Sequence, residues 1–343
     1  MSRATLNKAE RVEAALSGQT VDRVPVSAWG HLLPAETSTD TLAQATITFA
    51  KEYDWDWVKV NPRASYFAEA WGSEFDLKDY HGVLPRFVRN RHDPFDPGSL
   101  KPVGPEVKVW ADHISALKTI RQGLPGVPFV QTVFSPASVL GYLAGRPSDH
   151  SQAAAAQNHA DTLIHLIRTQ PAAVHHALGV IADSLASLAI ASIEAGASGI
   201  FFAITKLART GGLSPEEFAE FGRPYDIRVL NAVKSARFNV LHLCGTHTYW
   251  DSVQDYPVRA INWAAAGAGN PSLAAARQRS GLALIGGLDE LGAIQNGSPA
   301  EVREATLAAL AQGGRQKFLL SPGCCVEPNV PPANLRAFRD AVN

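Results

Sequence analysis

The sequence predicts a (β/α)8 TIM barrel built as a single domain. Eight short apolar runs with β-strand composition are spread along the 343 residues, and helical patterns lie between most of them. Strands that alternate with helices favour a parallel sheet with helices on its outside, and eight such units close into a barrel. A doubly wound open sheet is the alternative that the same alternation allows. The predicted strands are residues 24–28, 57–61, 128–133, 199–204, 239–243, 259–263, 283–287 and 317–320.

Helix-start signals support this alternation. Residues 153–168 and 171–195 are two long helical segments, and the second begins with a proline. Ser214 and Ser298 each precede a proline and at least one glutamate. This is the pattern of a helix N-cap followed by proline at the first helical position and acidic residues in the first turn. The helix after Ser298 is expected to end near Gly313.

A long segment separates the second and third predicted strands. Residues 64–127 are rich in Pro, Arg, Asp and Trp. A connection of this length inside a compact domain is usually functional or carries structure of its own. We therefore expect residues 64–127 to form an insertion that caps the mouth of the barrel.

Composition excludes several classes of protein. Hydrophobic residues make up 46% of the chain, charged residues 18%, and the net charge is −1. The chain offers no basic face for nucleic acid and no polybasic run for a membrane surface. No apolar stretch is expected to approach the length of about 20 residues that a membrane span needs, and the N-terminus lacks the apolar core of a signal peptide. Three cysteines in 343 residues indicate a reducing, cytoplasmic setting. A homodimer is left open.

The three cysteines and one histidine suggest a metal site. Cys244 lies in a His-Leu-Cys-Gly motif at 242–245, and Cys324 and Cys325 are adjacent in a Ser-Pro-Gly-Cys-Cys motif. Residues i and i+2 of a strand point to the same face, so His242 and Cys244 can hold one ion together. A cysteine from far along the chain adds a third ligand and leaves a fourth position open, which is typical of catalytic zinc.

Other interpretations of these cysteines stay open at this point. Free cysteine is among the most buried residue types and often only packs. A disulfide from Cys244 to either Cys324 or Cys325 is also compatible with the sequence, whereas strain opposes a bond between the adjacent pair. The spacing alone does not decide whether Cys324 or Cys325 would face a metal.

Further polar residues fall at the same ends of the predicted strands. Asn262 ends the sixth strand, Asp289 follows the seventh and Arg63 follows the second. The carboxyl ends of the strands form the face where barrel enzymes place their active sites. We therefore expect these residues near His242 and the cysteines.

Several motifs together resemble the uroporphyrinogen decarboxylase superfamily along nearly the whole chain. They are Val-Asp-Arg-Val-Pro-Val at 21–26, Ser-Pro with Gly-Tyr at 135–142, Leu-Ser-Pro-Glu-Glu-Phe at 213–218, Pro-Tyr at 224–225, Gly-Leu-Asp at 287–289 and Val-Pro-Pro-Ala-Asn-Leu at 330–335. The superfamily holds decarboxylases and zinc methyltransferases, and the remaining motifs bear on which branch this chain resembles.

The decarboxylase equipment is mostly missing. Those enzymes carry an Arg-Gln-Ala-Gly-Arg segment after the first strand, and residues 27–34 contain no arginine. Their aspartate after the second strand falls near Asn61, and the position of their late histidine is Cys324. Of their catalytic residues only Tyr142 matches.

The methyltransferase branch resembles this chain in both cysteine motifs. The resemblance implies that His242, Cys244 and Cys324 bind Zn²⁺. It also implies that a small thiol such as coenzyme M is activated as a zinc thiolate and accepts a methyl group. The methyl donor would be methylcobalamin on a separate corrinoid protein, because the chain lacks the Asp-x-His-x-x-Gly motif of corrinoid modules.

The other candidate site residues are expected in supporting roles. Asp289 could lie behind His242 or cap a helix, and Tyr142 could hydrogen-bond the substrate or only line the mouth. His31, Arg63 and Asn262 are expected to bind substrate, the first two through an anionic tail. Two other functions remain as alternatives: a carboxy-lyase acting on a different acid, and a non-catalytic barrel that binds zinc.

Overall fold

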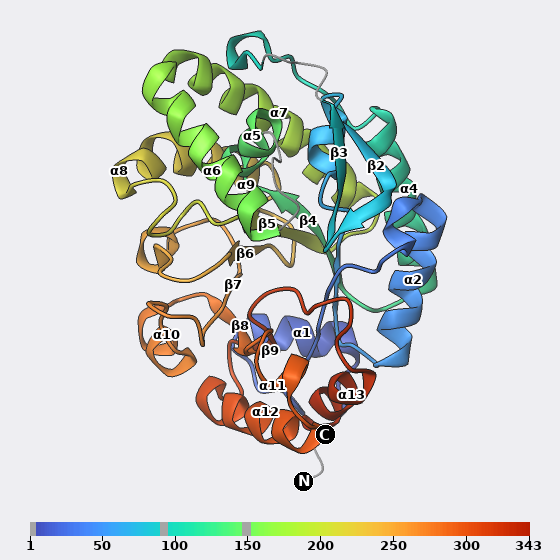
Figure 1. Cartoon of the computed structure of the whole chain (residues 1–343). Coiled ribbons are helices and arrows are strands. Elements are labelled where there is room, and N and C mark those ends of the chain that lie inside the picture. Colours follow the sequence, from blue (N-terminus) through green and yellow to red (C-terminus); the bar gives the residue numbers. More distant parts are fainter. Residues whose placement is uncertain (1–4, 90–94, 146–151) are drawn as a thin grey trace.

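The structure, a computed structural model, describes residues 5–89, 95–145 and 152–343. Its main sheet contains seven parallel strands in the order β1-β4-β5-β6-β7-β8-β9. Figure 1 shows these strands in the middle of the molecule with helices around them. The strands are β1 (Val58–Val60), β4 (Phe129–Phe134), β5 (Gly199–Ile204), β6 (Val240–Leu243), β7 (Ala260–Trp263), β8 (Ala283–Leu288) and β9 (Phe318–Pro322).

The predicted first strand, residues 24–28, is shorter than expected. It forms one isolated parallel bridge, from Val26 to Leu320 of β9. The backbone N–H of Leu320 donates to Pro25 O at 2.9 Å, and the N–H of Asp56 donates to Val26 O at 3.0 Å. The segment therefore lies between β9 and the residues before β1, in the eighth position. Proline has no N–H to donate, which limits the ladder here. The predicted (β/α)8 barrel is confirmed with this difference.

Helices alternate with the strands as predicted. The two long segments form α6 and α7, and both serine caps are present with capping boxes, Ser214 before α8 and Ser298 before α12. The helices are α1 (Lys8–Leu16), α2 (Thr39–Glu52), α3 (Tyr66–Ala70), α4 (Lys108–Gly123), α5 (Pro136–Ala144), α6 (Gln152–Thr169), α7 (Pro171–Glu194), α8 (Pro215–Glu217), α9 (Arg223–Ala232), α10 (Leu273–Arg279), α11 (Ala293–Asn296), α12 (Pro299–Gly313) and α13 (Pro332–Asp340).

The segment between β1 and β4 has structure of its own. It contains α3, an antiparallel hairpin of β2 (Glu74–His81) and β3 (Leu84–Arg89), and α4. Figure 1 shows the hairpin beside α4. Because α4 packs against α2, it serves as the barrel helix that follows β1, and only the part before it is additional to the barrel. Val83 and Leu84 of the hairpin tip line the cavity described below.

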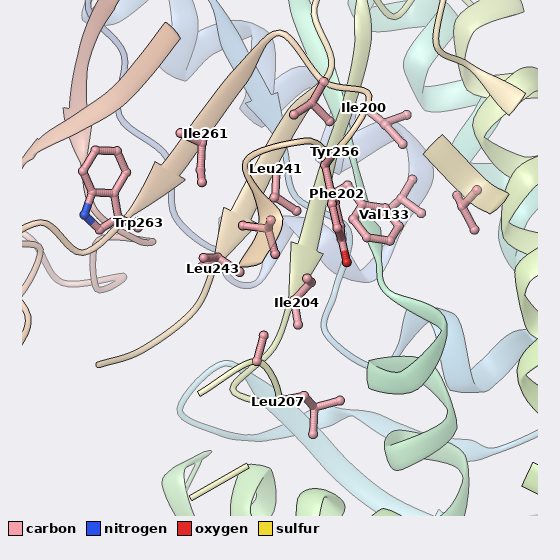
Figure 2. Close-up of a cluster of buried hydrophobic side chains, with 14 of the residues drawn as sticks. Val133, Ile200, Phe202, Ile204, Leu207, Leu241, Leu243, Tyr256, Ile261 and Trp263 are labelled. Carbon is pink, nitrogen blue, oxygen red and sulfur yellow. The ribbon is translucent and has the colours of Figure 1, made fainter. Parts of the chain in front are cut away.

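Side chains alternate along the strands between two packed layers. Figure 2 shows a cluster of buried side chains that includes Phe202, Leu241 and Leu243. The same cluster holds buried residues of α5, α7 and α9, so these strand residues face the surrounding helices. Phe201 belongs instead to the cluster inside the barrel, which also holds residues of β4, β6, β7, β8 and β9. This period of two turns the residue between Leu241 and Leu243, His242, toward the barrel interior.

Helix α7 is long and apolar enough to cross a membrane by length and composition alone. This differs from the expectation that no stretch would reach that length. Half of its apolar window is buried within the protein, where α7 contacts α5, α9 and β5. Packing within the barrel accounts for its composition.

Candidate metal centre

Three metal-binding side chains meet at the carboxyl ends of β6 and β9. His242 lies on β6, Cys244 follows that strand directly, and Cys324 lies two residues beyond the end of β9. Parallel strands end at one edge of the sheet, so residues 80 positions apart can become neighbours. One ligand atom from each of the three residues lies within 4.8 Å of the other two. The structure thus brings together the three residues that the sequence predicts as ligands.

Backbone contacts hold the two cysteine-bearing segments in place. The N–H of Cys244 donates to Ile204 O at 3.2 Å, and the N–H of Gly323 donates to Leu288 O at 2.9 Å. A side chain at position 323 would place its Cβ 2.6 Å from the Cα of Ala264. Only glycine permits this close approach, which brings the following Cys324 over the end of the sheet.

The hydrogen bonds of Asn262 set the tautomer of His242. Nδ2 of Asn262 donates to Ile285 O at 3.0 Å and to Pro322 O at 3.3 Å, so its Oδ1 is the atom that faces His242 Nδ1 at 2.6 Å. Oδ1 can only accept, and Nδ1 must donate. The neutral ring then carries its lone pair on Nε2, which lies 3.7 Å from Cys324 Sγ. A partner on the second nitrogen is how metal-binding histidines are usually oriented.

The spacing of the cluster fits a tetrahedral zinc ion. Zinc binds cysteine sulfur at about 2.3 Å and histidine nitrogen at about 2.0–2.1 Å, which at a tetrahedral angle separates the two ligand atoms by about 3.6 Å. The observed distance between Cys324 Sγ and His242 Nε2 is 3.7 Å. Two sulfurs and one nitrogen are also the donors that zinc prefers. Cys324 and His242 can therefore share a zinc ion with little movement, and the ligand atom of Cys244 lies within 4.8 Å of both.

Cys325 points elsewhere. Its Sγ accepts from Asn61 Nδ2 at 3.4 Å, and the side chain packs against the apolar cluster inside the barrel. A hydrogen bond with Cys324, together with burial, raises the pKa of the Cys325 thiol well above its usual range. A hydrogen bond from Cys324 lowers the pKa of Cys244 despite burial. All three cysteines are free thiols.

The cluster opens into a cavity of about 710 Å³ at the mouth of the barrel. This volume lies within the range of small-molecule sites. Its walls include the three cluster residues and four of the other predicted site residues, namely His31, Arg63, Tyr142 and Asp289.

Tyr142 of α5 is half-buried in the cavity wall. Its ring centroid lies 4.3 Å from that of His159 and 5.8 Å from that of Phe134. Burial raises the pKa of Tyr142 to about 12, with a smaller contribution from Cys244. The hydroxyl is therefore neutral at physiological pH and can donate a hydrogen bond into the cavity.

His31 and Arg63 are both paired with carboxylates of the chain. His31 Nδ1 lies 2.8 Å from Oε2 of the buried Glu36, and Arg63 makes a bidentate pair with Glu69 at 2.7 and 2.5 Å. Burial opposes protonation of His31, but the hydrogen bond and charge of Glu36 outweigh it and raise the pKa of His31. Arg63 has its guanidinium occupied by Glu69, so its availability for a substrate anion is smaller than the sequence suggested.

Asn262 and Asp289 differ from their expected positions. Asn262 was expected to bind substrate, but it is fully buried behind His242 and all its polar atoms have partners in the protein. Asp289 was expected either behind His242 or as a helix cap. It is exposed, and its Oδ1 accepts from Leu291 N at 3.0 Å in the turn before α11, whose N-cap residue is Gly292. Asn262 thus takes the place beside the histidine, because β7 and not β8 is the neighbour of β6.

Sequence reasoning missed Lys59 of β1. Only 8% of this residue is exposed, and it lines the cavity close to the cluster. The available signal was a lysine inside an otherwise apolar strand, at alternate positions with Asn61 and Arg63. Period-two alternation places these three side chains toward one face.

Comparisons with known proteins agree with this architecture. Residues 7–343 match the family model described as uroporphyrinogen decarboxylase (URO-D). A uroporphyrinogen decarboxylase from Synechococcus sp. (strain JA-2-3B'a(2-13)) is 28% identical over 236 residues, which span 63% of this chain and 64% of that enzyme. The chain thus matches less than two thirds of the length of that relative.

Two further similarities extend over almost the whole chain. The methylcobamide:CoM methyltransferase MtbA of Methanosarcina acetivorans is 24% identical over 352 residues, covering 95% of each protein. The solved structure of a methyltransferase from Methanosarcina mazei superimposes with a TM-score of 0.79 at 20% identity, covering 98% of each chain. At this identity the structural likeness concerns the fold. From the match over residues 7–343, the chain belongs to the uroporphyrinogen decarboxylase family of enzymes.

Proposed function

We propose that this protein is a zinc-dependent methyltransferase that transfers a methyl group to a small thiol. His242, Cys244 and Cys324 would hold the metal. The observation that carries the proposal is the preformed cluster: two thiols and one imidazole nitrogen within 4.8 Å of one another, facing a cavity. The resemblance of both cysteine motifs to the methyltransferase branch adds to it.

The protein residues have definable tasks in this reaction. Asn262 keeps the hydrogen of His242 on Nδ1 and so leaves Nε2 free as a ligand. Cys244 and Cys324 supply two thiolates, and three protein ligands leave one position of a tetrahedral site open to the cavity. Zinc bound there would lower the pKa of an incoming thiol and hold it as the nucleophilic thiolate.

The cavity walls would exclude water and orient the substrate. Tyr142 presents a neutral hydroxyl that can donate to the substrate, and Phe201 and Phe134 supply apolar surface. The barrel mouth gives a methyl donor access to the open position. A methyl-corrinoid on a separate protein is the proposed donor, because the full-length relative MtbA is named a methylcobamide:CoM methyltransferase. The proposed location is the cytoplasm, where thiols stay reduced.

A carboxy-lyase is the competing function. The match to uroporphyrinogen decarboxylases favours it, and so do the basic side chains of Lys59 and His31 in the cavity, which could bind an acid. Such a reaction would leave the two cluster cysteines without a task. A barrel that binds zinc without catalysis is the third alternative.

Metal analysis combined with a methyl-transfer assay separates the three. We expect close to one zinc per chain, and methylation of a small thiol by methylcobalamin that depends on zinc. Cys244→Ser should lose both the metal and the activity. Decarboxylation of an acid that persists after zinc removal would favour the lyase. Bound zinc without turnover of any substrate would favour the binding barrel.

A further inference from the structure

Lys59 is a buried lysine for which the described residues supply no carboxylate partner. It is 8% exposed, and among the described residues no carboxylate oxygen lies within 4 Å of its Nζ. Asp289, Glu290 and Glu327 line the same cavity but make no ion pair with it. A buried charge without a partner is costly, and proteins usually provide one.

The contacts of Lys59 orient its ammonium group and leave donors unused. Asn61 Oδ1 accepts from Nζ, while Asn61 Nδ2 donates to Gly30 O at 3.1 Å and to Cys325 Sγ at 3.4 Å. These bonds fix the amide of Asn61 and therefore the direction of the lysine. An ammonium group has three donors, and the described residues accept from one of them.

Phe201 connects this lysine to the candidate metal centre. Its ring centroid lies 4.8 Å from Lys59 Nζ and 5.3 Å from the ring centroid of His242. Lys59 and the cluster thus both lie beside one aromatic side chain, and both line the cavity. His31, which is paired with the buried Glu36, lines the cavity as well.

We propose that Lys59 is the anion-binding residue of this cavity and determines its preference for a small substrate that carries a carboxylate, sulfonate or phosphate group. The acidic group would accept hydrogen bonds from the free Nζ donors, and the rest of the molecule would extend past Phe201 to the cluster. The proposal rests on the proposed function for the reacting atom, which would be a thiol sulfur. It does not rest on it for the anion site itself. Burial lowers the pKa of Lys59, with the neighbouring thiols opposing, and a bound anion would favour the charged form.

A matched pair of thiols tests the preference. Calorimetry would compare 3-mercaptopropionate with 3-mercaptopropanol on zinc-loaded protein, since the two differ only in the terminal group. We expect the acid to bind at least about tenfold more tightly to the natural protein, as for a charge-assisted hydrogen bond in a buried site. The ratio should fall close to one in Lys59→Met and be largely kept in Lys59→Arg. Lys108→Met removes an exposed lysine of α4 and serves as the control that leaves the ratio unchanged.

Anions without sulfur separate this proposal from the methyltransferase itself. Propionate, propanesulfonate and propyl phosphate would be titrated into the protein as purified, which also identifies the preferred acidic group. Binding of one of them by the natural protein and its loss in Lys59→Met would support the anion site, even if the thiols fail to react. An unchanged thiol ratio in Lys59→Met, or anion binding that survives the substitution, would overturn the proposal.

Discussion

Replacing Asn262 by alanine should weaken zinc binding without removing a ligand. The side chain accepts the Nδ1 hydrogen of His242 at 2.6 Å, and its loss frees the ring to rotate or to carry the hydrogen on Nε2. Outer partners of metal-binding histidines are typically worth 10–100-fold in metal affinity. That range corresponds to about 1.4–2.7 kcal/mol at 25 °C.

The same substitution should also lower the free energy of unfolding. Asn262 is fully buried and donates to Ile285 O and Pro322 O, which would lose a partner. An unsatisfied buried polar group costs roughly 1–3 kcal/mol. Asn239→Ala is the matched control. Asn239 is 1% exposed, accepts a hydrogen bond from Ile200 N and donates one to Val233 O, and it makes no contact with the cluster residues in these bonds.

The two effects can be measured separately. Competition with a chromophoric chelator gives the zinc dissociation constant, and urea unfolding gives the stability. We expect both variants to lose similar stability and only Asn262→Ala to lose zinc affinity. If Asn262→Ala binds zinc as tightly as Asn239→Ala, the argument that Asn262 sets the histidine tautomer for the metal is wrong.

Four further predictions follow from the same geometry. Cys324→Ala should lose most of its zinc while Cys325→Ala keeps it, and equal zinc contents would contradict the assignment of Cys324 as the ligand. Chelation of the metal should lower the melting temperature of the natural protein, because a ligand at about 100 times its dissociation constant stabilises the folded state by about 2.7 kcal/mol; a Tm insensitive to chelation would count against the site. Burial raises the pKa of Asp226 well above its usual range, although Tyr256 donates a hydrogen bond to it, so the folded state holds the proton more tightly and stability should fall as the pH rises above about 4. Asp226→Asn should remove this slope in urea unfolding between pH 4 and 8, and parallel profiles would refute it. Uroporphyrinogen should yield no coproporphyrinogen above a heat-killed control, since residues 27–34 lack the arginines of the decarboxylases.

The barrel and the cluster could be predicted because they depend on local patterns. Alternation of strands with capped helices predicts the fold. His242 and Cys244 are two positions apart along a strand, so their side chains point to the same face of the sheet. The position after a strand end then brings Cys324 to the same edge. These arguments need only the period of a strand and the common direction of parallel strands.

The remaining site depends on which strands and side chains are neighbours. Asn262 is the register partner of His242 on the adjacent β7, whereas Asp289 follows β8, one strand further away. The predicted barrel implies the order of the strands, but it does not specify which residues of neighbouring strands lie side by side. The pairing of His31 with Glu36 and of Arg63 with Glu69 depends on short turns and helices whose geometry the sequence pattern does not specify. Lys59 was missed because the hydrophobic pattern of a three-residue strand is too short to show which face is inside.

The charge around the cluster connects Asn262, whose role differs from the one expected, with Lys59, which the sequence analysis missed. Two cysteine thiolates neutralise Zn²⁺, so a third thiolate would bring one net negative charge into a buried site. Asn262 orients His242 without adding charge, whereas a carboxylate in its place would add a second negative charge. Lys59 lies beside Phe201, and in its protonated form the low dielectric of the site would strengthen its attraction for an anion. A neutral amide behind the histidine and the lysine side chain beside the cavity both favour an anionic nucleophile at the cluster. Substitutions of Asn262 and of Lys59 therefore test the same proposed reaction, the activation of an anionic thiol at the cluster. The Asn262 variant tests it through the affinity for the metal, and the Lys59 variant tests it through the affinity for the substrate.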